Sequence, residues 1–116
     1  MSDDTCNGWV NRETWAVAVN VGNIPDAYRE VSAWAGQVVR HRGVRVPAGP
    51  AVAAVADGLR VWVEDMRDET FRPGGGSLDW QRQLVREAGS LWRVDWHAIA
   101  RGYVEDAAGD IGVELV

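Results

Sequence analysis

The sequence has few of the residues that carry reaction chemistry. Its single cysteine, Cys6, excludes an internal disulfide, and no histidine lies near it in sequence to activate it as a nucleophile. The two histidines, His41 and His97, lack the spacing of a zinc site. Neighbouring carboxylates such as Glu64 and Asp65 point away from each other on a helix and make poor acid/base pairs. We therefore expect no enzymatic activity, no metal and no cofactor.

Lysine and long apolar runs are also missing. All 12 basic side chains are arginine, which suits bidentate contacts to carboxylate or phosphate, although a GC-rich coding sequence gives the same bias. The net charge of −5 disfavours nucleic-acid binding through bulk charge and fits a protein that presents acid to a basic partner. No stretch resembles a signal peptide or a membrane span, so we expect a cytoplasmic protein with no membrane partner.

Tryptophan is abundant where the other aromatic residues are scarce. Seven Trp stand against one Phe and two Tyr in 116 residues, a length that fits one domain. We expect most of these rings to be wedges between helices in the core, because rings at helical spacing are usually core. The alternative is that one or two of them lie at a binding surface, where tryptophan is enriched.

Apolar periodicity predicts an all-α fold, a compact single domain over residues 1–116 with four to five helices. The expected helices run from Asn11 to about Val21, from Pro25 to about Arg40, from Ala51 to Arg67, from Leu78 to Ala88 and from Trp96 to about Ala107. The expected N-caps are Asn11, Ser77 and Asp95, and the expected helix ends are Gly22-Asn23, Gly89 and Gly109.

The third of these helices has the most regular pattern and should be the central one. Its apolar stripe, at spacings of 3, 4, 3 and 4, consists of Val52, Val55, Leu59, Trp62 and Met66. Gly58 within it indicates close approach of another element. In the first helix we expect Trp15, Ala18 and Val19 to face the core.

Two connections and both termini lack a helical pattern. Residues 43–50 hold two prolines and two glycines and leave room for a short extended piece, and residues 71–76 end in three glycines that predict a flexible loop. Those glycines lack the lysine and hydroxyl residue of a phosphate loop, so we reject that function for them. Residues 1–5 should be frayed, and residues 110–116 should be frayed or pair as an edge strand.

Two charged clusters are candidate binding surfaces. The acidic cluster lies at the end of the third helix and is either a solvated face or a docking surface for a basic partner; it consists of Glu64, Asp65, Asp68 and Glu69. The arginine cluster follows the second helix and could contact phosphates; it consists of Arg40, Arg42 and Arg45.

Two short motifs resemble those of a family of small proteins encoded by bacteriophages, plasmids and archaeal mobile elements. Residues 7–15 read N-G-W-V-N-R-E-T-W, where the family reads roughly N-G-W-T-N-x-x-T-W, and residues 94–100 read V-D-W-H-A-I-A, where it reads V-D/N-W-x-x-I-A. Val10 replaces the usual Thr, and Val19-Asn20 stands where many members have Leu and an aromatic residue. The motif positions singled out are Trp9, Asn11, Thr14, Trp15, Asp95, Trp96 and Ile99.

The resemblance implies a setting and no catalytic residue. It favours a mobile-element accessory protein that binds and inhibits a host nuclease or defence complex, such as CRISPR or restriction machinery. The alternatives are a small nucleic-acid-associated regulator that uses the arginine cluster, with a tryptophan for stacking, and self-association through exposed tryptophan. We also expect the segment from Trp9 to Trp15 and the helix from Asp95 to Tyr103 to pack near each other around the stripe from Val52 to Met66.

Overall fold

Five α-helices account for most of the chain in a computed structural model, which describes residues 8–40 and 44–116. The helices are α1 (Arg12–Asn23), α2 (Pro25–Arg40), α3 (Ala48–Phe71), α4 (Asp79–Ala88) and α5 (Trp96–Ile111). The shorter elements are β1 (Arg45–Val46), the 3-10 helix η1 (Leu91–Arg93) and β2 (Glu114–Leu115). The prediction of an all-α single domain of four to five helices is confirmed.

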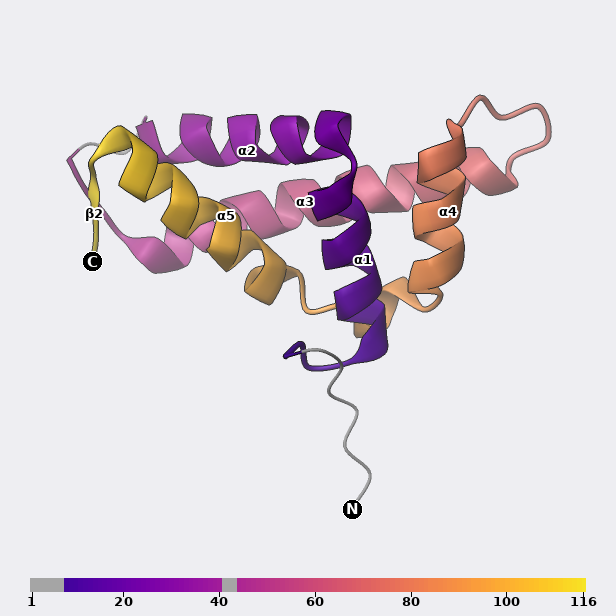
Figure 1. Ribbon diagram of the computed structural model, residues 1–116, viewed down its shortest axis with the longest axis horizontal. Helices are drawn as coiled ribbons and strands as arrows, with labels where there is room; N and C mark the ends of the chain where they lie inside the picture. Colours follow the sequence, from indigo (N-terminus) through magenta and orange to yellow (C-terminus); the bar gives the residue numbers. More distant parts are fainter. Residues whose placement is uncertain (1–7, 41–43) are drawn as a thin grey trace, which may run out of the picture.

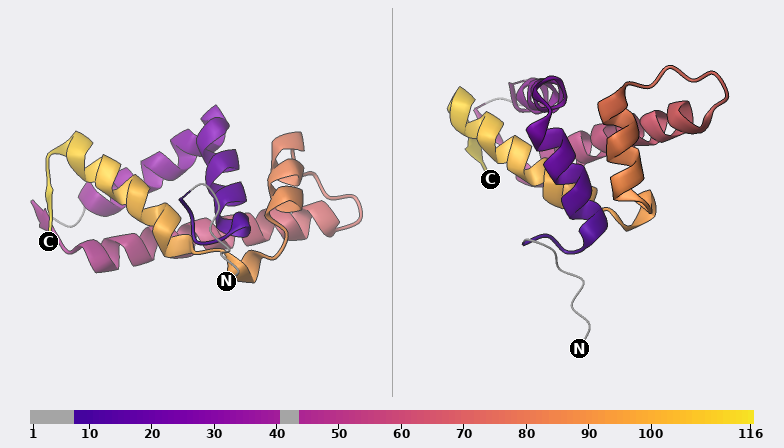
Figure 2. Two further views of the ribbon diagram at one scale, coloured as in Figure 1. Left: turned by 60° about the horizontal axis from the view of Figure 1, so that its bottom comes forward. Right: turned by 45° about the vertical axis from the view of Figure 1, so that its right-hand side comes forward.

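The helices form two groups. α2, α3 and α5 pack against one another, with α3 running opposite to α2 (Figure 1). α1 and α4 lie side by side and run in opposite directions, and each also contacts the first group, α1 through α2 and α4 through α3 (Figures 1 and 2). Between the two motifs, α2 leads the chain away from α1 and α3 leads it back. α4 then lies beside α1.

The core is built mainly from valine, alanine and leucine. The expected stripe on α3 is confirmed, since its buried residues include Val52, Val55, Leu59 and Met66, with the ring of Trp62 partly buried beside them. A Cβ atom added at Gly58 would lie 3.9 Å from Cε3 of Trp34 on α2. The glycine therefore lies against the α2 ring, as its place in the pattern predicted.

The buried face of α1 differs from the prediction. Trp15, Ala18 and Val19 are only half-buried, whereas the fully buried residues of this helix are Thr14, Ala16, Val17, Asn20 and Val21. Two of these five residues are polar, and each has a hydrogen-bond partner in the interior. The hydrophobic pattern misplaced the face because it counted Thr14 and Asn20 as surface residues.

Four helix ends also differ from the prediction, and one of them is the end of α3, which lies at Phe71 and not at Arg67. α1 continues through Gly22 to Asn23, and the next residue, Ile24, is extended because it precedes Pro25. α3 begins at Ala48 and includes Pro50 in its first turn. Proline is tolerated there because a backbone N–H in the first turn has no acceptor within the helix. α5 continues past Gly109 to Gly112, which closes it with a left-handed φ of 84°.

The C-terminal tail pairs with the connection before α3. β1 and β2 are parallel, with Arg45 opposite Glu114 and Val46 opposite Leu115. The backbone N–H of Val116 donates to the carbonyl oxygen of Val46 at 2.9 Å. Of the two possibilities for residues 110–116, the structure has the strand, and the short extended piece expected in residues 43–50 is its partner. Residues 1–5 lie outside the described residues.

Candidate functional site

The two sequence motifs meet in a buried hydrogen-bond network, which we call the motif junction, made by Asn11, Thr14, Arg93 and Asp95. Asn11 caps α1 by accepting from the backbone N–H of Thr14 at 2.9 Å, and its side-chain amide donates to the carbonyl oxygen of Arg93 at 2.7 Å. The Thr14 hydroxyl accepts from the backbone N–H of Asp95 at 2.9 Å. These bonds confirm that the first segment and the start of α5 lie together.

Asp95 and an ion pair complete the motif junction. The Asp95 carboxylate accepts from the backbone N–H of Ala98 at 3.1 Å and so caps α5, as predicted. Glu13, in the first turn of α1, lies with Oε2 at 3.6 Å from Nε of Arg93. Each helix start is thus capped by a residue of its own motif and tied to the other motif, which is a structural role.

The remaining motif residues also contribute packing. Ile99 is buried, and the rings of Trp9 and Trp96 are partly buried against the core. Trp15 is half-buried on α1. These side chains thus help to pack the two motif segments against the core.

Three further tryptophans join three helices. The ring of Trp62 on α3 meets that of Trp34 on α2 edge-on, with centroids 5.0 Å apart, and that of Trp80 on α4 at 6.0 Å. All three rings are partly buried against the core. These three tryptophans are wedges between helices, as the sequence predicted for most of the seven, and edge-on or tilted aromatic pairs of this kind add to the stabilisation from burial.

The acidic cluster lies on the outer side of α3, but half of it is engaged within the chain. Glu69 pairs with Arg72 and accepts from the backbone N–H of Gly76 at 3.3 Å. Asp68 lies 3.4 Å from Arg67. Glu64 and Asp65 are in no ion pair that the structure records among its described residues.

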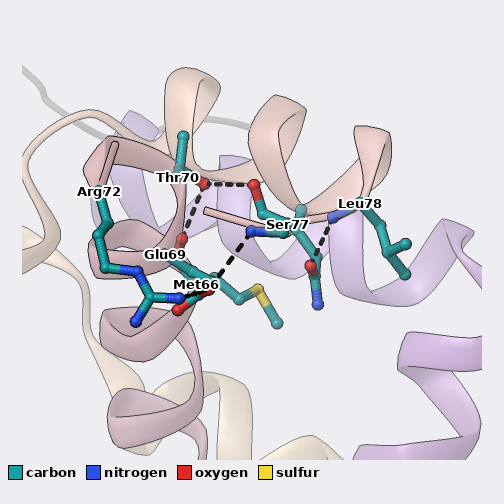
Figure 3. Close-up of polar contacts among 8 residues, drawn as sticks. Met66, Glu69, Thr70, Arg72, Ser77 and Leu78 are labelled. Carbon is teal, nitrogen blue, oxygen red and sulfur yellow. Dashed lines mark hydrogen bonds and ion pairs between the residues drawn. The ribbon is translucent and has the colours of Figure 1, made fainter. Parts of the chain in front are cut away.

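Hydrogen bonds to side chains at the end of α3 and the start of α4 hold the glycine-rich connection between these helices (Figure 3). Thr70 donates from its hydroxyl to the carbonyl oxygen of Met66 at 2.7 Å and lies 3.2 Å from the hydroxyl of Ser77. Ser77 therefore does not cap α4 as predicted; Leu78 occupies that position, and its backbone N–H donates to Oε1 of Gln81 at 2.8 Å. These bonds link the connection to the end of α3 and the start of α4, and the flexibility expected for its three glycines stays a prediction.

The arginine cluster stands beside acidic groups. Nε of Arg45 lies 3.7 Å from the Glu114 carboxylate. Arg40 lines a groove between α2 and α5 that also includes Asp110. Arg42 lies outside the described residues. The two described arginines therefore do not form a surface of unopposed positive charge, and no observation favours the nucleic-acid alternative.

The most exposed large apolar side chain belongs to a residue that the sequence did not single out. Trp92, in η1, is 84% exposed, while Leu91 and Val94 on either side of it are buried. Val10, which precedes Asn11, is 52% exposed, and the bond from Asn11 to Arg93 brings it to the same end of the molecule as Trp92. Periodicity could not find Trp92, because the ring lies in a short turn between helices.

A cavity of about 200 Å³ opens between α1, α2 and α5 and is lined by rings. Trp9, Tyr28 and Tyr103 line it together with Ile99, Gly102 and Asp106. The two tyrosine rings lie with centroids 5.8 Å apart. Burial raises the pKa of Tyr103 to about 12, with smaller contributions from Tyr28 and Asp106.

The described residues include no group of three or more His, Cys, Asp or Glu placed to hold a metal ion. In the same part of the chain no helix is both long and apolar enough to cross a bilayer. Comparison with known proteins finds no matching family model, no matching curated protein and no matching solved structure. The resemblance of the two motifs therefore stands on their residues alone.

Proposed function

We propose that this chain acts by binding another protein and not by catalysis, with Trp92 as the anchor of the binding surface. The observation that carries the proposal is the exposure of Trp92, at 84%, on a turn that is fixed by buried neighbours. Exposing so large an apolar ring to water is unfavourable, and tryptophan is the residue type most enriched among the energetic centres of protein interfaces.

The turn that carries Trp92 is pre-ordered for binding. Leu91 and Val94 are buried, and the carbonyl oxygen of Arg93 accepts the Asn11 amide bond of the motif junction. A ring held on such a turn loses little backbone entropy when a partner covers it. The net charge of −5, the exposed Asp65 and the half-buried Glu64 further favour a basic partner.

The more specific form of the proposal is an accessory protein of a phage or mobile element that inhibits a host nuclease or defence complex. This setting comes from the resemblance of the two motifs. Expression of the protein in a host with an active defence system should protect an incoming phage or plasmid. Failure to protect against any defence system tested would contradict this form and leave the binding function to be decided separately.

The binding function is tested by capture of partners from host lysate, treated with nuclease and identified by mass spectrometry. We expect one stoichiometric protein partner, and we expect Trp92→Ala to lose it while the fold is unchanged. Phe71→Ala is the matched control, because Phe71 is an aromatic ring of similar exposure, at 73%, in another part of the molecule. Equal capture by Trp92→Ala and wild type would contradict the assignment of Trp92.

A further inference from the structure

The cavity between α1, α2 and α5 combines aromatic rings with one carboxylate. Trp9, Tyr28 and Tyr103 contribute the rings and Asp106 the carboxylate. The faces of aromatic rings attract cations, and a carboxylate at the same site adds charge complementarity and a pair of hydrogen-bond acceptors. The cavity therefore fits a cation with an apolar or planar body.

The size of the cavity restricts the ligand to one side chain. Its volume of about 200 Å³ is below the range of roughly 300–1,000 Å³ that is typical of sites for whole small molecules. Gly102 leaves the α5 side of the cavity open, since a Cβ atom added there would meet no atom within 4 Å. The lack of a side chain at Gly102 thus leaves space in the cavity that a larger residue would fill.

Among cationic groups, guanidinium matches these walls best. It is planar, stacks on aromatic rings, is more weakly hydrated than ammonium and pairs with a carboxylate through two parallel hydrogen bonds. We propose that the cavity lined by Trp9, Tyr28, Tyr103 and Asp106 binds the guanidinium group of an arginine side chain presented by a partner protein. That the arginine comes from a partner rests on the proposed binding function.

The raised pKa of Tyr103 is consistent with this ligand. Tyr103 stays neutral through the physiological range, so its hydroxyl remains a hydrogen-bond donor beside Asp106, whose negative charge contributes to the shift. A bound cation would find one formal negative charge and three neutral rings in the cavity. Arginine is also enriched at protein interfaces, where lysine is depleted.

The test is a titration of the full chain with a capped arginine, acetyl-arginine methylamide, followed by the amide signals of Gly102 and the indole N–H of Trp9. We expect saturable shifts with a dissociation constant in the millimolar range, as for a single side chain. The capped citrulline, which has nearly the same shape and no charge, should cause no saturable shift. Equal binding of citrulline, or tighter binding of the capped lysine, would overturn the proposal.

Substitutions distinguish binding of the capped arginine in the cavity from binding elsewhere on the surface. Asp106→Asn should weaken binding of the capped arginine about three- to tenfold, and Gly102→Leu should abolish it while the leucine favours the helix. Asp110→Asn, one turn further along α5, should leave the affinity unchanged. Equal affinities of the Asp106 and Asp110 variants would overturn the assignment.

Capture from host lysate then tests the source of the arginine. Asp106→Asn should retain less of the partner than Asp110→Asn, and full retention by both variants would overturn the claim that the partner fills the cavity. The titration needs no partner, so absent shifts refute this inference alone. Capture of no protein partner at all would instead refute the proposed function.

Discussion

The hydroxyl of Thr14 accepts a hydrogen bond from the backbone N–H of Asp95 at 2.9 Å, across 81 positions of the sequence. The same hydroxyl donates to Oδ1 of Asn11 at 2.7 Å, and Thr14 is fully buried. A single threonine therefore supports the N-cap of α1 and satisfies a backbone donor at the cap of α5. We therefore expect the motif junction to depend on this hydroxyl.

Replacing Thr14 by valine tests this dependence. Thr14→Val keeps the shape but leaves the N–H of Asp95 without its acceptor, and we expect a loss of about 2 kcal/mol in the free energy of unfolding. Thr14→Ser keeps the hydroxyl and loses one methyl group, for about 1 kcal/mol. Urea unfolding of both variants measures the difference, and a valine variant as stable as the serine variant would refute the role of the hydroxyl.

At Gly75, in the connection between α3 and α4, the neighbouring backbone leaves no room for a side chain. A Cβ atom at Gly75 would lie 1.9 Å from the carbonyl oxygen of Glu69, whereas a Cβ atom at Gly76 would meet nothing within 4 Å. We expect Gly75→Ala to destabilise the fold by about 2–3 kcal/mol and Gly76→Ala to change stability by less than about 0.5 kcal/mol. Thermal unfolding of the pair measures this contrast, and similar melting temperatures would contradict it.

Local signals in the sequence were sufficient for the helices and the central stripe. Asn11 and Asp95 were recognised as caps because a cap acts within three residues, and the stripe from Val52 to Met66 because a helix face repeats along the chain. The pairing of Arg45 with Glu114 could not be predicted, because nothing in either segment specifies a partner so distant in sequence.

The candidate surfaces were harder to predict than the fold. The sequence showed four acidic residues at the end of α3, but it could not show that Glu69 is engaged by Arg72 and by the backbone of Gly76. It also gave no sign that Trp92 is exposed, since exposure of a ring in a turn depends on how α4 and α5 pack. Surface assignments require the tertiary contacts, which spacing does not contain.

Glu87 should make the fold sensitive to acid. Hydrogen bonds from the side chains of Asn20, at 2.9 Å, and Gln83, at 3.0 Å, lower the pKa of Glu87 in the folded state. A carboxyl group with a lowered pKa stabilises the fold above its unfolded pKa, about 4.3 for glutamate, and this stabilisation is lost as the pH falls through the folded value.

Glu87→Gln removes the titrating group, so the free energy of unfolding of this variant should fall less than that of the wild type between about pH 7 and about pH 3, a range that includes the glutamate pKa of about 4.3. Urea unfolding across this range measures the slope. Glu105→Gln, at an exposed glutamate of α5, serves as the charge-matched control and should follow the wild type. Equal slopes for Glu87→Gln and the wild type would remove Glu87 as a source of acid sensitivity.

Tyr103 should make the fold sensitive to alkali in a narrow range of pH. Burial raises its pKa to about 12 in the folded state, against about 10 for an unfolded tyrosine. The stabilisation that follows is complete below about pH 10 and is lost as the pH rises through the folded value. Tyr103→Phe keeps the ring and removes the titrating hydroxyl, so its free energy of unfolding should fall less steeply than that of the wild type across this range. Because the chain has no lysine and arginine titrates above about 12, tyrosine dominates the titration in this window. If the free energy of unfolding of Tyr103→Phe falls with pH as steeply as that of the wild type, folding does not raise the pKa of Tyr103.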